Sequence, residues 1–360
     1  MSECLIVGGG LIGMLIAREL ARAGQSVTLL EKGNLGQESS WAGGGIISPL
    51  YPWRFGDAVT QLARWSQGVY RELAEELRQE SGIDPEWTQN GLLILDTDES
   101  DQAASWAEEY DYSCEIVAEA RIRQLEPELG DTSETGIWLP DVAQVRNPRL
   151  VKAMRGSLEY HGVRIQEQCE VDGLCLDGNR LGGVKAAGKM IAAERVIITS
   201  GAWSGGLLQS LGIRLKVKPL RGQMLLFNTR PGLVSRIVLS RDRYVIPRRD
   251  GRVLVGSTLE DVGFDRSTTH EAKEALIAEA RRLIPALANY EVEHHWAGLR
   301  PASPDGIPYI YEDQKYAGLY VNTGHFRNGV VLGPASARLM ADIVLKKSPI
   351  LSLSPYNMYV

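Results

Sequence analysis

The sequence of 360 residues lacks several features that mark particular classes of protein. Its four cysteines, Cys4, Cys114, Cys169 and Cys175, have the spacing of no metal site. No apolar run approaches the ~20 residues that a membrane-spanning helix needs. Net charge is −6, without a run of lysine or arginine. A membrane span and a metal site are therefore not expected. Nucleic acid is not expected as a partner either, because phosphate binding needs a basic face.

The start of the chain shows no positively charged leader or cleavage site before "CLIVGGG". A secretory signal is therefore not expected. The cysteines are interpreted as free, half-buried thiols in a reducing compartment, so the expected location is the cytoplasm. With 44% hydrophobic and 23% charged residues, the composition is that of a globular protein, and the length allows two units with a shared core.

Residues 3–32 carry a pattern that is typical of nucleotide-binding folds. They predict a strand, a glycine turn, a helix and a second strand that ends in an acid. Gly8, Gly10 and Gly13 form G-x-G-x-x-G, which permits a tight turn, close approach of a pyrophosphate and close packing of helix on strand. Glu31 lies where a carboxylate accepts hydrogen bonds from ribose hydroxyls, and an acid there disfavours NADP. The pattern predicts a site for an ADP group and leaves FAD and NAD both open.

The segments after this unit extend the predicted site. Residues 36–48 form a polar, glycine-rich loop where a second part of a dinucleotide would lie. A meander follows, with predicted turns at Asp177-Gly178 and Gly182-Gly183, and then a strongly apolar strand that ends near Gly201. Late in the chain, the strand "GLYVNT" leads through "GHFRNG" into a closing helix, with Pro334 expected in its first turn.

The order of glycine turn, meander and "VIITSGAWS" is similar to the FAD-binding domain of the D-amino-acid oxidase and glycine oxidase family of amine oxidoreductases. "PLRGQ", "YVIPRRDGRVLVGST", "WAGLRP" and "GHFRNG" also resemble this family, and its glycine oxidase branch most closely. The resemblance covers most of the chain and is strongest at residues 1–35 and 219–340. It implies FAD as the cofactor. Non-covalent binding is expected, because no cysteine follows Cys175 and no histidine precedes His161.

The fold class that follows is α/β, with a Rossmann-type FAD-binding domain that includes a β-meander. An α+β substrate domain with a mainly antiparallel sheet completes it. The expected FAD-binding domain is discontinuous and comprises residues 1–85, 145–217 and 316–360. The expected substrate-binding domain comprises residues 86–144 and 218–315. Within the latter, Asp250-Gly251 predicts the turn of a hairpin, and residues 269–287 predict an amphipathic helix that lies over the sheet.

Arg300 is the residue that we expect to bind the substrate. It ends an apolar strand, and a buried guanidinium needs an anionic partner, either in a structural ion pair or in the carboxylate of a ligand. The resemblance implies the second, with a phenolic hydrogen bond from Tyr244 and with Arg327 beside the substrate amine. His325 is expected to pack and not to catalyse. No protein base is evident, and none is required if the amine binds in its neutral form.

The glycine motif and the resemblance together predict a set of residues in contact with FAD. Backbone N–H groups at the start of the closing helix are expected to stabilise negative charge on the pyrimidine side of the flavin. The predicted contacts are Gly8, Gly10, Leu11, Ile12, Gly13, Glu31, Lys32, Ser39, Ser40, Gly43, Gly44, Gly45, Ile46, Val171, Gly201, Trp203, Gly222, Arg300, His325, Arg327, Asn328, Gly329 and Val330.

The activity that the resemblance implies is oxidative deamination of glycine or another small amino acid or amine. Hydride would pass from the α-carbon to flavin N5, O2 would become H2O2, and the imine of glycine would serve thiamine biosynthesis. One alternative is a dehydrogenase of D-amino acids or secondary amines with a quinone or protein acceptor. Another is an FAD-binding subunit that oxidises no amine. Leu259 stands where the family often has methionine, and the segment Tyr51–Arg54 is unusual, so the preferred amine is left open. The choice between monomer and homo-oligomer is also left open.

Overall fold

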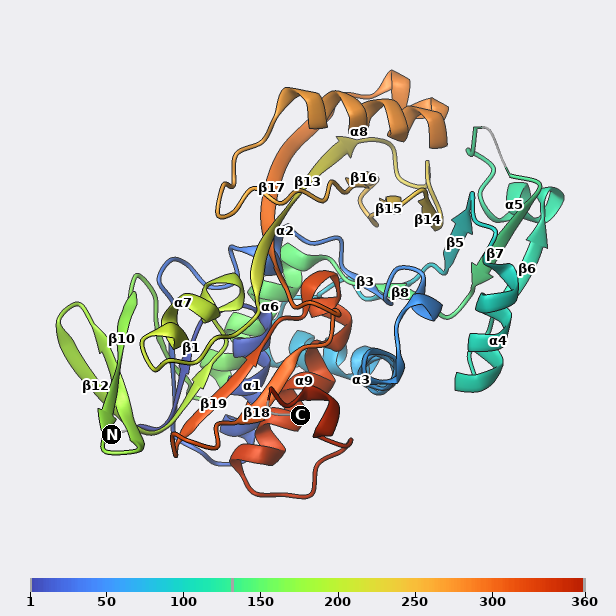
Figure 1. Ribbon diagram of the computed structural model, residues 1–360. Helices are drawn as coiled ribbons and strands as arrows, with labels where there is room; N and C mark the ends of the chain where they lie inside the picture. Colours follow the sequence, from blue (N-terminus) through green and yellow to red (C-terminus); the bar gives the residue numbers. More distant parts are fainter. Residues whose placement is uncertain (1, 131–132, 359–360) are drawn as a thin grey trace.

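The computed structural model describes residues 2–130 and 133–358. Their strands form two sheets of eight strands and one sheet of three. Figure 1 shows a lower part built around β1, α1 and α9, and an upper part in which α8 lies over β13 and β16. One large sheet has a parallel core and the other is mainly antiparallel, which confirms the expected α/β fold class.

The first sheet has its parallel core in the order β9-β2-β1-β12-β19. Its strands are β1 (Ser2–Val7), β2 (Val27–Leu30), β9 (Arg164–Gln166), β10 (Val171–Asp177), β11 (Arg180–Ala186), β12 (Lys189–Ile198), β18 (Tyr309–Glu312) and β19 (Leu319–Thr323). Val7 lies beside both Leu30 and Ile198. The strands β1, β2 and β12 therefore end at one edge of the sheet, which is where ligands bind in open α/β folds.

Both faces of the first sheet are covered. The helices on one face are α1 (Leu11–Arg22), α3 (Asp57–Ser81), α6 (Asn147–Tyr160) and α9 (Gly329–Val344). The strands β10 and β11 of the meander and α7 (Ser204–Gln209) cover the other face. Cys4 and Ile6 of β1 pack against the helices, whereas Leu5 and Val7 pack against the meander side. Burial on both faces explains why β1 is almost continuously apolar.

The meander differs from the prediction in its second turn. The first turn follows Asp177 as expected, but Gly182 and Gly183 lie inside β11, and the second turn falls at residues 187–188. Gly183 has φ of 152°, and a Cβ atom on it would lie 2.3 Å from the carbonyl oxygen of Ile191 in β12. Here glycine allows two backbones to approach closely, which the sequence pattern does not distinguish from a turn.

The second sheet has the order β17-β13-β16-β15-β14-β5-β7-β6. Its strands are β5 (Leu92–Leu95), β6 (Glu115–Ala118), β7 (Thr135–Leu139), β13 (Lys218–Asn228), β14 (Ile237–Ser240), β15 (Arg243–Pro247), β16 (Arg252–Gly256) and β17 (Val292–Ala302), with the helices α4 (Ser100–Tyr110), α5 (Glu119–Leu125) and α8 (His270–Leu283). Leu225 and Val255 pack with α8 on the outer face. Met224 and Tyr244 lie on the inner face. The hairpin of β15 and β16 and the helix over the sheet are confirmed.

Short elements connect the two large sheets. The three-stranded sheet consists of β3 (Ile46–Ile47), β8 (Ala143–Gln144) and β4 (Thr88–Gln89), and a short helix, α2 (Ser39–Ala42), precedes it. The 3-10 helices are η1 (Pro52–Arg54), η2 (Gly201–Trp203), η3 (Pro285–Asn289), η4 (Phe326–Asn328) and η5 (Ser354–Tyr356). The loop predicted at residues 36–48 therefore contains α2 and β3, with the three glycines 43–45 between them.

Pro334 lies inside α9 and not in its first turn, which corrects the prediction. A proline there removes the N–H that would bond to the carbonyl group of Val330 and disturbs the next bond of the helix. Side chains of α3 compensate, because the hydroxyl of Tyr70 donates to the carbonyl oxygen of Val330 (2.9 Å) and the N–H of Ala335 donates to Ser66 Oγ (3.0 Å). Partners far away in the sequence thus make an interior proline tolerable.

The division of the chain into two domains stays a prediction. The memberships of the two large sheets support it, with one exception: β18 precedes residue 316 but pairs with β19 in the first sheet. We therefore propose that the last boundary falls before Tyr309. In the part of the chain that the structure describes, no helix is long and apolar enough to cross a membrane.

Candidate active site

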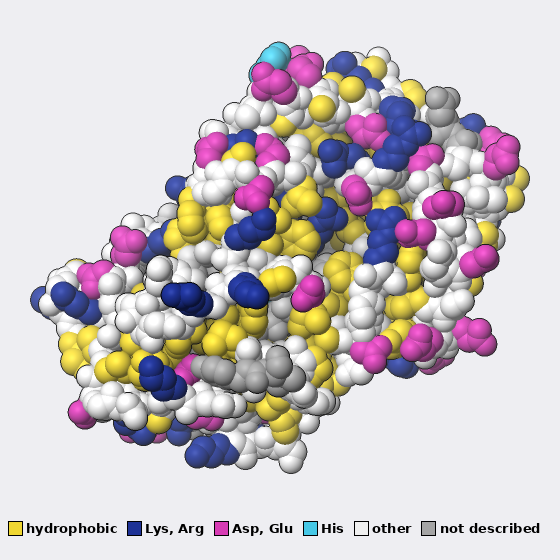
Figure 2. All heavy atoms as spheres, viewed as in Figure 1, with side chains coloured by type: hydrophobic (Ala, Val, Ile, Leu, Met, Phe, Trp, Pro, Cys, Tyr) yellow, Lys and Arg dark blue, Asp and Glu magenta, His cyan; other side chains and the backbone are white. Residues whose placement is uncertain are grey.

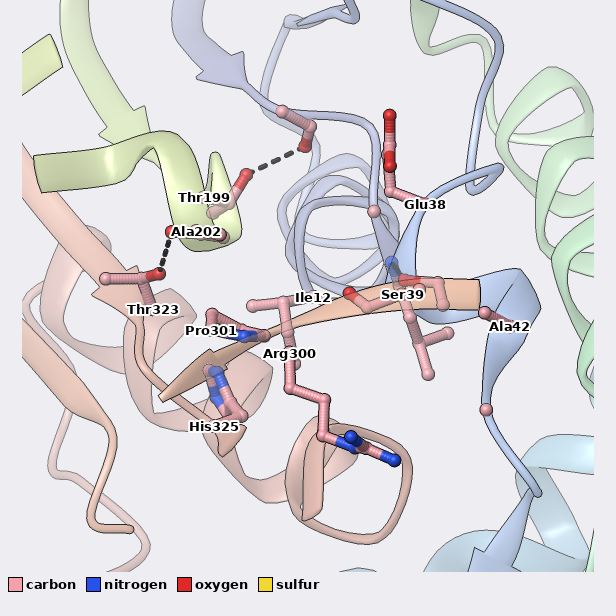
Figure 3. A pocket seen from close by; sticks show the side chains of 18 of the residues that line it. Ile12, Glu38, Ser39, Ala42, Thr199, Ala202, Arg300, Pro301, Thr323 and His325 are labelled. Carbon is pink, nitrogen blue, oxygen red and sulfur yellow. Dashed lines mark hydrogen bonds between the residues drawn. The ribbon is translucent and has the colours of Figure 1, made fainter. Parts of the chain in front are cut away.

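A cavity of about 470 Å³ lies between the two large sheets, where β1, β2 and β12 end. It extends from Glu31 and Val171 in the lower part to Tyr244 and Arg300 in the upper part. Figure 2 shows hydrophobic side chains, with lysine and arginine beside them, in the band between the two parts of the molecule. Figure 3 looks into the cavity, with Glu38, Ser39 and Ala42 on one side and Pro301, Thr323 and His325 on the other.

The glycine turn follows β1 and brings the start of α1 to the cavity. Gly8 has φ of 113°, and a Cβ atom there would lie 2.6 Å from the carbonyl oxygen of Thr199. A Cβ atom on Gly13 would lie 2.0 Å from the carbonyl oxygen of Gly8. By contrast, a Cβ atom on Gly10 would meet only Ser40 Oγ, at 3.3 Å. Gly8 and Gly13 are thus required by the packing of the protein, while Gly10 leaves room for a ligand.

Glu31 ends β2 at the lower end of the cavity and is 9% exposed. One carboxylate oxygen accepts a hydrogen bond from the N–H of Gly9 (2.7 Å), and the other accepts one from the N–H of Gly33 (2.9 Å). The sequence predicted only a contact with ribose and missed these two bonds. A carboxylate accepts about four hydrogen bonds, so Glu31 can hold the turn and still accept from a ligand.

Most of the segment of residues 39–46 lines the cavity beside the glycine turn. Ser40 Oγ accepts a hydrogen bond from the N–H of Leu11 (2.8 Å), and the carbonyl oxygen of Ser40 accepts one from Asn147 Nδ2 (2.7 Å). Further along, the carbonyl oxygen of Gly44 accepts a hydrogen bond from Arg248 Nη2 (2.8 Å). These bonds fasten a glycine-rich segment with little side-chain packing of its own to α1, α6 and β15.

Arg300 extends from β17 at the upper end of the cavity. Its Nη1 donates to the carbonyl oxygen of Thr258 (3.1 Å) and its Nη2 donates to Ser257 Oγ (2.7 Å). Among the described residues it has no carboxylate as an ion-pair partner, and both partners are neutral. Burial lowers the pKa of the Arg300 guanidinium, and the nearby charge of Arg327 acts in the same direction. A guanidinium has five N–H donors, so this buried cation has capacity left for an anion in the cavity.

Tyr244 lies beside Arg300 on the inner face of the second sheet and is 7% exposed. Its hydroxyl donates a hydrogen bond to Met224 Sδ (3.1 Å). A thioether is a weak acceptor, so a stronger acceptor in the cavity would displace it at little cost. Gly222 and Gly44 leave this corner open: a Cβ atom on Gly222 would collide with Arg300, and one on Gly44 would lie 3.3 Å from the Tyr244 ring.

Arg327 borders the cavity, but its charge is partly balanced. Its Nη1 lies 3.9 Å from Asp242 Oδ1, and Arg54 Nη1 lies 4.0 Å from the same oxygen. The guanidinium of Arg54 stacks 3.8 Å from the centre of the Tyr51 ring and pairs with Glu99 at 2.8 Å. The segment of residues 51–54 therefore joins the lower part of the molecule to β14 and β15 of the upper part, beside the cavity.

His325 is 2% exposed and lies in a hydrogen-bonded chain behind the cavity wall. Ser336 Oγ donates to Asn322 Oδ1 (3.0 Å), so it accepts from His325 Nε2 (2.7 Å). This assigns the proton of the neutral ring to Nε2. Burial lowers the pKa of His325 to about 3. The ring is therefore neutral at ordinary pH, and its Nε2 proton is committed to the protein.

Nearly all of the predicted contact residues line this one cavity. Gly13 does not, because it packs α1 onto the turn. Leu259 does not line it either; its side chain is 45% exposed. Residues that the sequence analysis missed include Glu38, Leu50, Met224, Ser257 and Phe326. Met224 belongs to β13, and Ser257 follows β16. Only the register of the sheet shows that these two residues face the cavity.

The residues present fit FAD. At the lower end, Gly10 leaves space at the N-terminus of α1, whose positive dipole end favours a pyrophosphate. At the other end, Asn328 lines the cavity, and its Nδ2 is buried without a hydrogen-bond partner. A donor buried in this way needs an acceptor from a ligand. Among residues 2–130 and 133–358, no group of three His, Cys, Asp or Glu side chains is placed to hold a metal ion.

Comparisons with known proteins agree with this arrangement. The chain is 48% identical to the glycine oxidase of Pseudomonas aeruginosa, over 99% of this chain and 98% of that one. It is 45% identical to the glycine oxidase of Pseudomonas putida, over 98% and 97% of the two chains. The solved structure of glycine oxidase from Geobacillus kaustophilus matches with a TM-score of 0.95 and 30% identity, over 99% and 98% of the chains.

The family model described as "DAO: FAD dependent oxidoreductase" matches residues 3–343, which is nearly the whole chain. The match includes the glycine turn, the meander, β15 to β17 and the start of α9, which together form the cavity. The chain therefore belongs to the family of FAD-dependent oxidoreductases, and FAD is its cofactor.

Proposed function

We propose that this enzyme oxidatively deaminates glycine or another small amino acid. The observation that carries the proposal is Arg300, a half-buried cation that faces the cavity and that, among the described residues, donates hydrogen bonds only to neutral oxygens. A carboxylate matches the planar fork of a guanidinium by two parallel hydrogen bonds. The likeness to glycine oxidases at 45–48% identity supports a small amino acid as the source of that carboxylate.

Three side chains would bind and orient the substrate. Arg300 would hold the carboxylate, and Tyr244 would turn its hydroxyl from Met224 Sδ to the same group. Arg327 would border the amine, with Asp242 balancing its charge. Holding a substrate in a reactive geometry contributes several kcal/mol in intramolecular models, on the order of 7–11 kcal/mol at most. The main role of these residues would therefore be to orient the substrate.

Proton transfer makes no demand on the protein in this proposal. The described titratable residues at the upper end of the cavity are Tyr244, Arg300, His325 and Arg327. His325 is engaged with Ser336, and the cations cannot act as bases. The amine would therefore bind in its neutral form, so activity should rise with pH as the free amine loses its proton.

The cofactor would lie along the length of the cavity. Gly10 and the start of α1 would receive the pyrophosphate, with Glu31 at the ribose and Asn328 and Gly329 beside the flavin ring. The flavin supplies the electron sink that accepts the hydride of the substrate. The N-terminus of α9 and the neighbouring N–H groups would stabilise negative charge there. Non-covalent binding is part of the proposal.

We further propose O2 as the acceptor, with H2O2 as product, and supply of the glycine imine to thiazole synthesis as the biological role. The cytoplasmic location and the oligomeric state remain predictions from the sequence. No observation in the structure favours a quinone or protein acceptor over O2.

The test is the purified yellow protein with glycine, sarcosine, D-alanine and methylamine. Anaerobic addition of glycine should bleach the flavin, and admission of air should give one H2O2 for each substrate. Methylamine lacks the carboxylate and should fail to bleach, since it leaves Arg300 unpaired. Bleaching without oxygen uptake would instead establish a dehydrogenase with another acceptor. No bleaching by any amine would sink the proposal and favour a subunit that oxidises no amine.

A further inference from the structure

A segment between β16 and α8, residues 257–269, has an anchored base. Arg221 of β13 is 4% exposed and makes ion pairs with two carboxylates of this segment, Glu260 (2.5 Å) and Asp265 (2.5 Å). Gln223 Nε2 donates to Glu260 Oε1 (2.9 Å), and the N–H of Thr269 donates to Gln223 Oε1 (2.9 Å). A buried guanidinium paired twice in this way fixes the segment to the second sheet, and we call residues 257–269 the strap.

The tip of the strap reaches the first, lower part of the molecule. Arg266 Nη1 pairs with Glu38 Oε1 at 2.7 Å, and the ring of Phe264 lies 5.4 Å from the ring of Trp203. Lys32 Nζ lies 3.4 Å from the centre of the same Trp203 ring. Glu38, Lys32 and Trp203 all line the cavity, as does Glu31. The strap thus touches the end of the cavity where the nucleotide unit of the fold lies. Figure 1 shows it as the loop beside β17 that leads into α8.

The side chains of the strap are unusual for a surface loop. Leu259, Val262 and Phe264 are 45%, 40% and 53% exposed, and they are three of the eight large hydrophobic residues exposed among those that the structure describes. Phe264 therefore contributes little to a core. Its aromatic partner is Trp203 on η2, 61 positions earlier in the chain. Trp203 lies in the lower part of the molecule, with the first sheet.

We propose that the strap is a latch that retains FAD by closing over its adenosine end. Arg221 fixes the backbone of the strap through Glu260 and through Asp265, which lies between the two tip residues, so only the side chains of Phe264 and Arg266 open and close. One partly exposed ion pair and one aromatic contact hold these two side chains in place. Both tip contacts are weak enough to open and close, since exposed ion pairs and exposed aromatic pairs each stabilise only modestly. Arg266 and Phe264 are positioning residues in this proposal, because they act on the cofactor through Glu38 and Trp203. The inference rests on the proposed placement of the cofactor, not on the identity of the substrate.

The experiment measures the rate at which the holoenzyme releases FAD, followed by the rise of free-flavin fluorescence after dilution. Arg266→Gln and Phe264→Ala should each raise the release rate several-fold, and the double variant on the order of tenfold. Raising the salt concentration should speed release from the natural protein, since the Arg266–Glu38 pair is exposed and screened by salt. Release from Arg266→Gln should respond less to salt, an effect that a purely structural change would not produce.

Matched controls are present in the chain. Arg230→Gln removes an arginine with the same 58% side-chain exposure as Arg266, paired with Glu128 at 3.4 Å, and should leave release unchanged. Leu176→Ala shortens an apolar side chain that is 43% exposed, and serves in the same way for Phe264. Glu31→Gln changes the lower end of the cavity without touching the strap and should raise the release rate, because it alters both the expected ribose contact and the hydrogen bonds that hold the glycine turn.

The outcomes separate the two ideas. If Glu31→Gln speeds release but the double strap variant does not, the latch is wrong and the placement stands. If neither changes the rate, both the placement and the latch are wrong. Faster release from Arg230→Gln or Leu176→Ala to the same extent as from the strap variants would also overturn the latch, since the effect would then be general.

Discussion

Arg300, which is half-buried, and Arg248, which is buried, both follow apolar strand residues of the same sheet, yet they have different surroundings. Arg248 is 9% exposed and gives hydrogen bonds to Gln144 Oε1 (2.5 Å) and to the carbonyl oxygens of Val145 (3.0 Å) and Gly44 (2.8 Å). Arg300 meets two neutral oxygens and faces the cavity. Among the described residues, neither has a carboxylate as an ion-pair partner.

The difference between these two arginines limits the rule that a buried guanidinium needs an anionic partner. A buried guanidinium was expected to need an anion, but neutral oxygens satisfy Arg248 on several sides, and burial lowers its pKa only to about 10. Arg18 shows the expected case, with Glu76 at 2.8 Å and Glu80 at 2.6 Å. Absence of a carboxylate therefore favours a ligand only when the neutral oxygens of the protein also leave N–H donors of the guanidinium unused. Arg248, which borders a second, smaller cavity, donates to three oxygens and holds the glycine-rich segment, whereas Arg300 donates to two and is our proposed ligand-binding residue.

The largest effect is expected for Arg300→Met. Removing one partner of a buried, hydrogen-bonded charge pair costs about 3–5 kcal/mol, which is roughly a 10²- to 10⁴-fold loss in kcat/KM for glycine. The melting temperature should stay the same or rise, because an uncompensated buried cation is gone. Steady-state kinetics and thermal unfolding measure both quantities. Unchanged turnover of glycine would place the carboxylate elsewhere.

Arg248→Met should show the opposite pattern. Three buried oxygens lose their donor at about 1–3 kcal/mol each, and relief of the buried charge offsets a part. We expect the free energy of unfolding to fall by about 2–4 kcal/mol, with a smaller loss of kcat/KM than in Arg300→Met. Denaturant unfolding with bound flavin measures the first quantity. A variant that is as stable as the natural protein but inactive would erase the distinction between the two arginines.

Tyr244→Phe should weaken binding of the carboxylate and leave stability nearly unchanged. Phenylalanine cannot make the hydrogen bond to the charged substrate carboxylate, which costs about 1.5–3 kcal/mol, or roughly a 10- to 100-fold loss in kcat/KM. In the free enzyme, the substitution removes only the hydrogen bond from Tyr244 to Met224 Sδ, which is a weak acceptor. The double variant with Arg300→Met should lose less than the sum of the two effects, since both act on one carboxylate. Strict additivity would mean that the two side chains bind different groups.

The smallest effect concerns His325, a buried base that stays neutral where the arginines stay charged. Burial lowers its pKa from 6.5 to about 3, so between these values the unfolded chain binds a proton that the folded protein does not. Stability is therefore fully present above pH 6.5 and is lost as the pH falls toward 3. His325→Asn should lower the melting temperature at every pH and flatten its decline from pH 7 to pH 5. An unchanged slope would show that other groups cause the decline.

About half of the residues that line the cavity were predictable from local patterns. The glycine turn, the acid that follows β2, and the motifs around Arg300 and Arg327 identified residues that, with the exception of Gly13, all line it. The errors have a common cause. Gly183 and Pro334 were interpreted by their usual local roles, but a close strand contact explains the first, and hydrogen bonds from Tyr70 and Ser66 explain the second. Tyr70 and Ser66 are distant from Pro334 in the sequence, and the contact of Gly183 with Ile191 depends on the register of two neighbouring strands, so no local pattern contains either.

The sequence by itself determined the nucleotide-binding unit, because Gly8, Gly10 and Gly13 lie at fixed spacing in one turn between a strand and a helix. It also identified Arg300 as a cation on an apolar strand. Only the tertiary structure shows how each cation is satisfied: Gly44, Val145 and Gln144 bring three oxygens to Arg248, whereas Arg300 donates to two oxygens among the described residues. Satisfaction of a buried charge is a property of the assembled cavity, where oxygens distant in the chain meet one guanidinium.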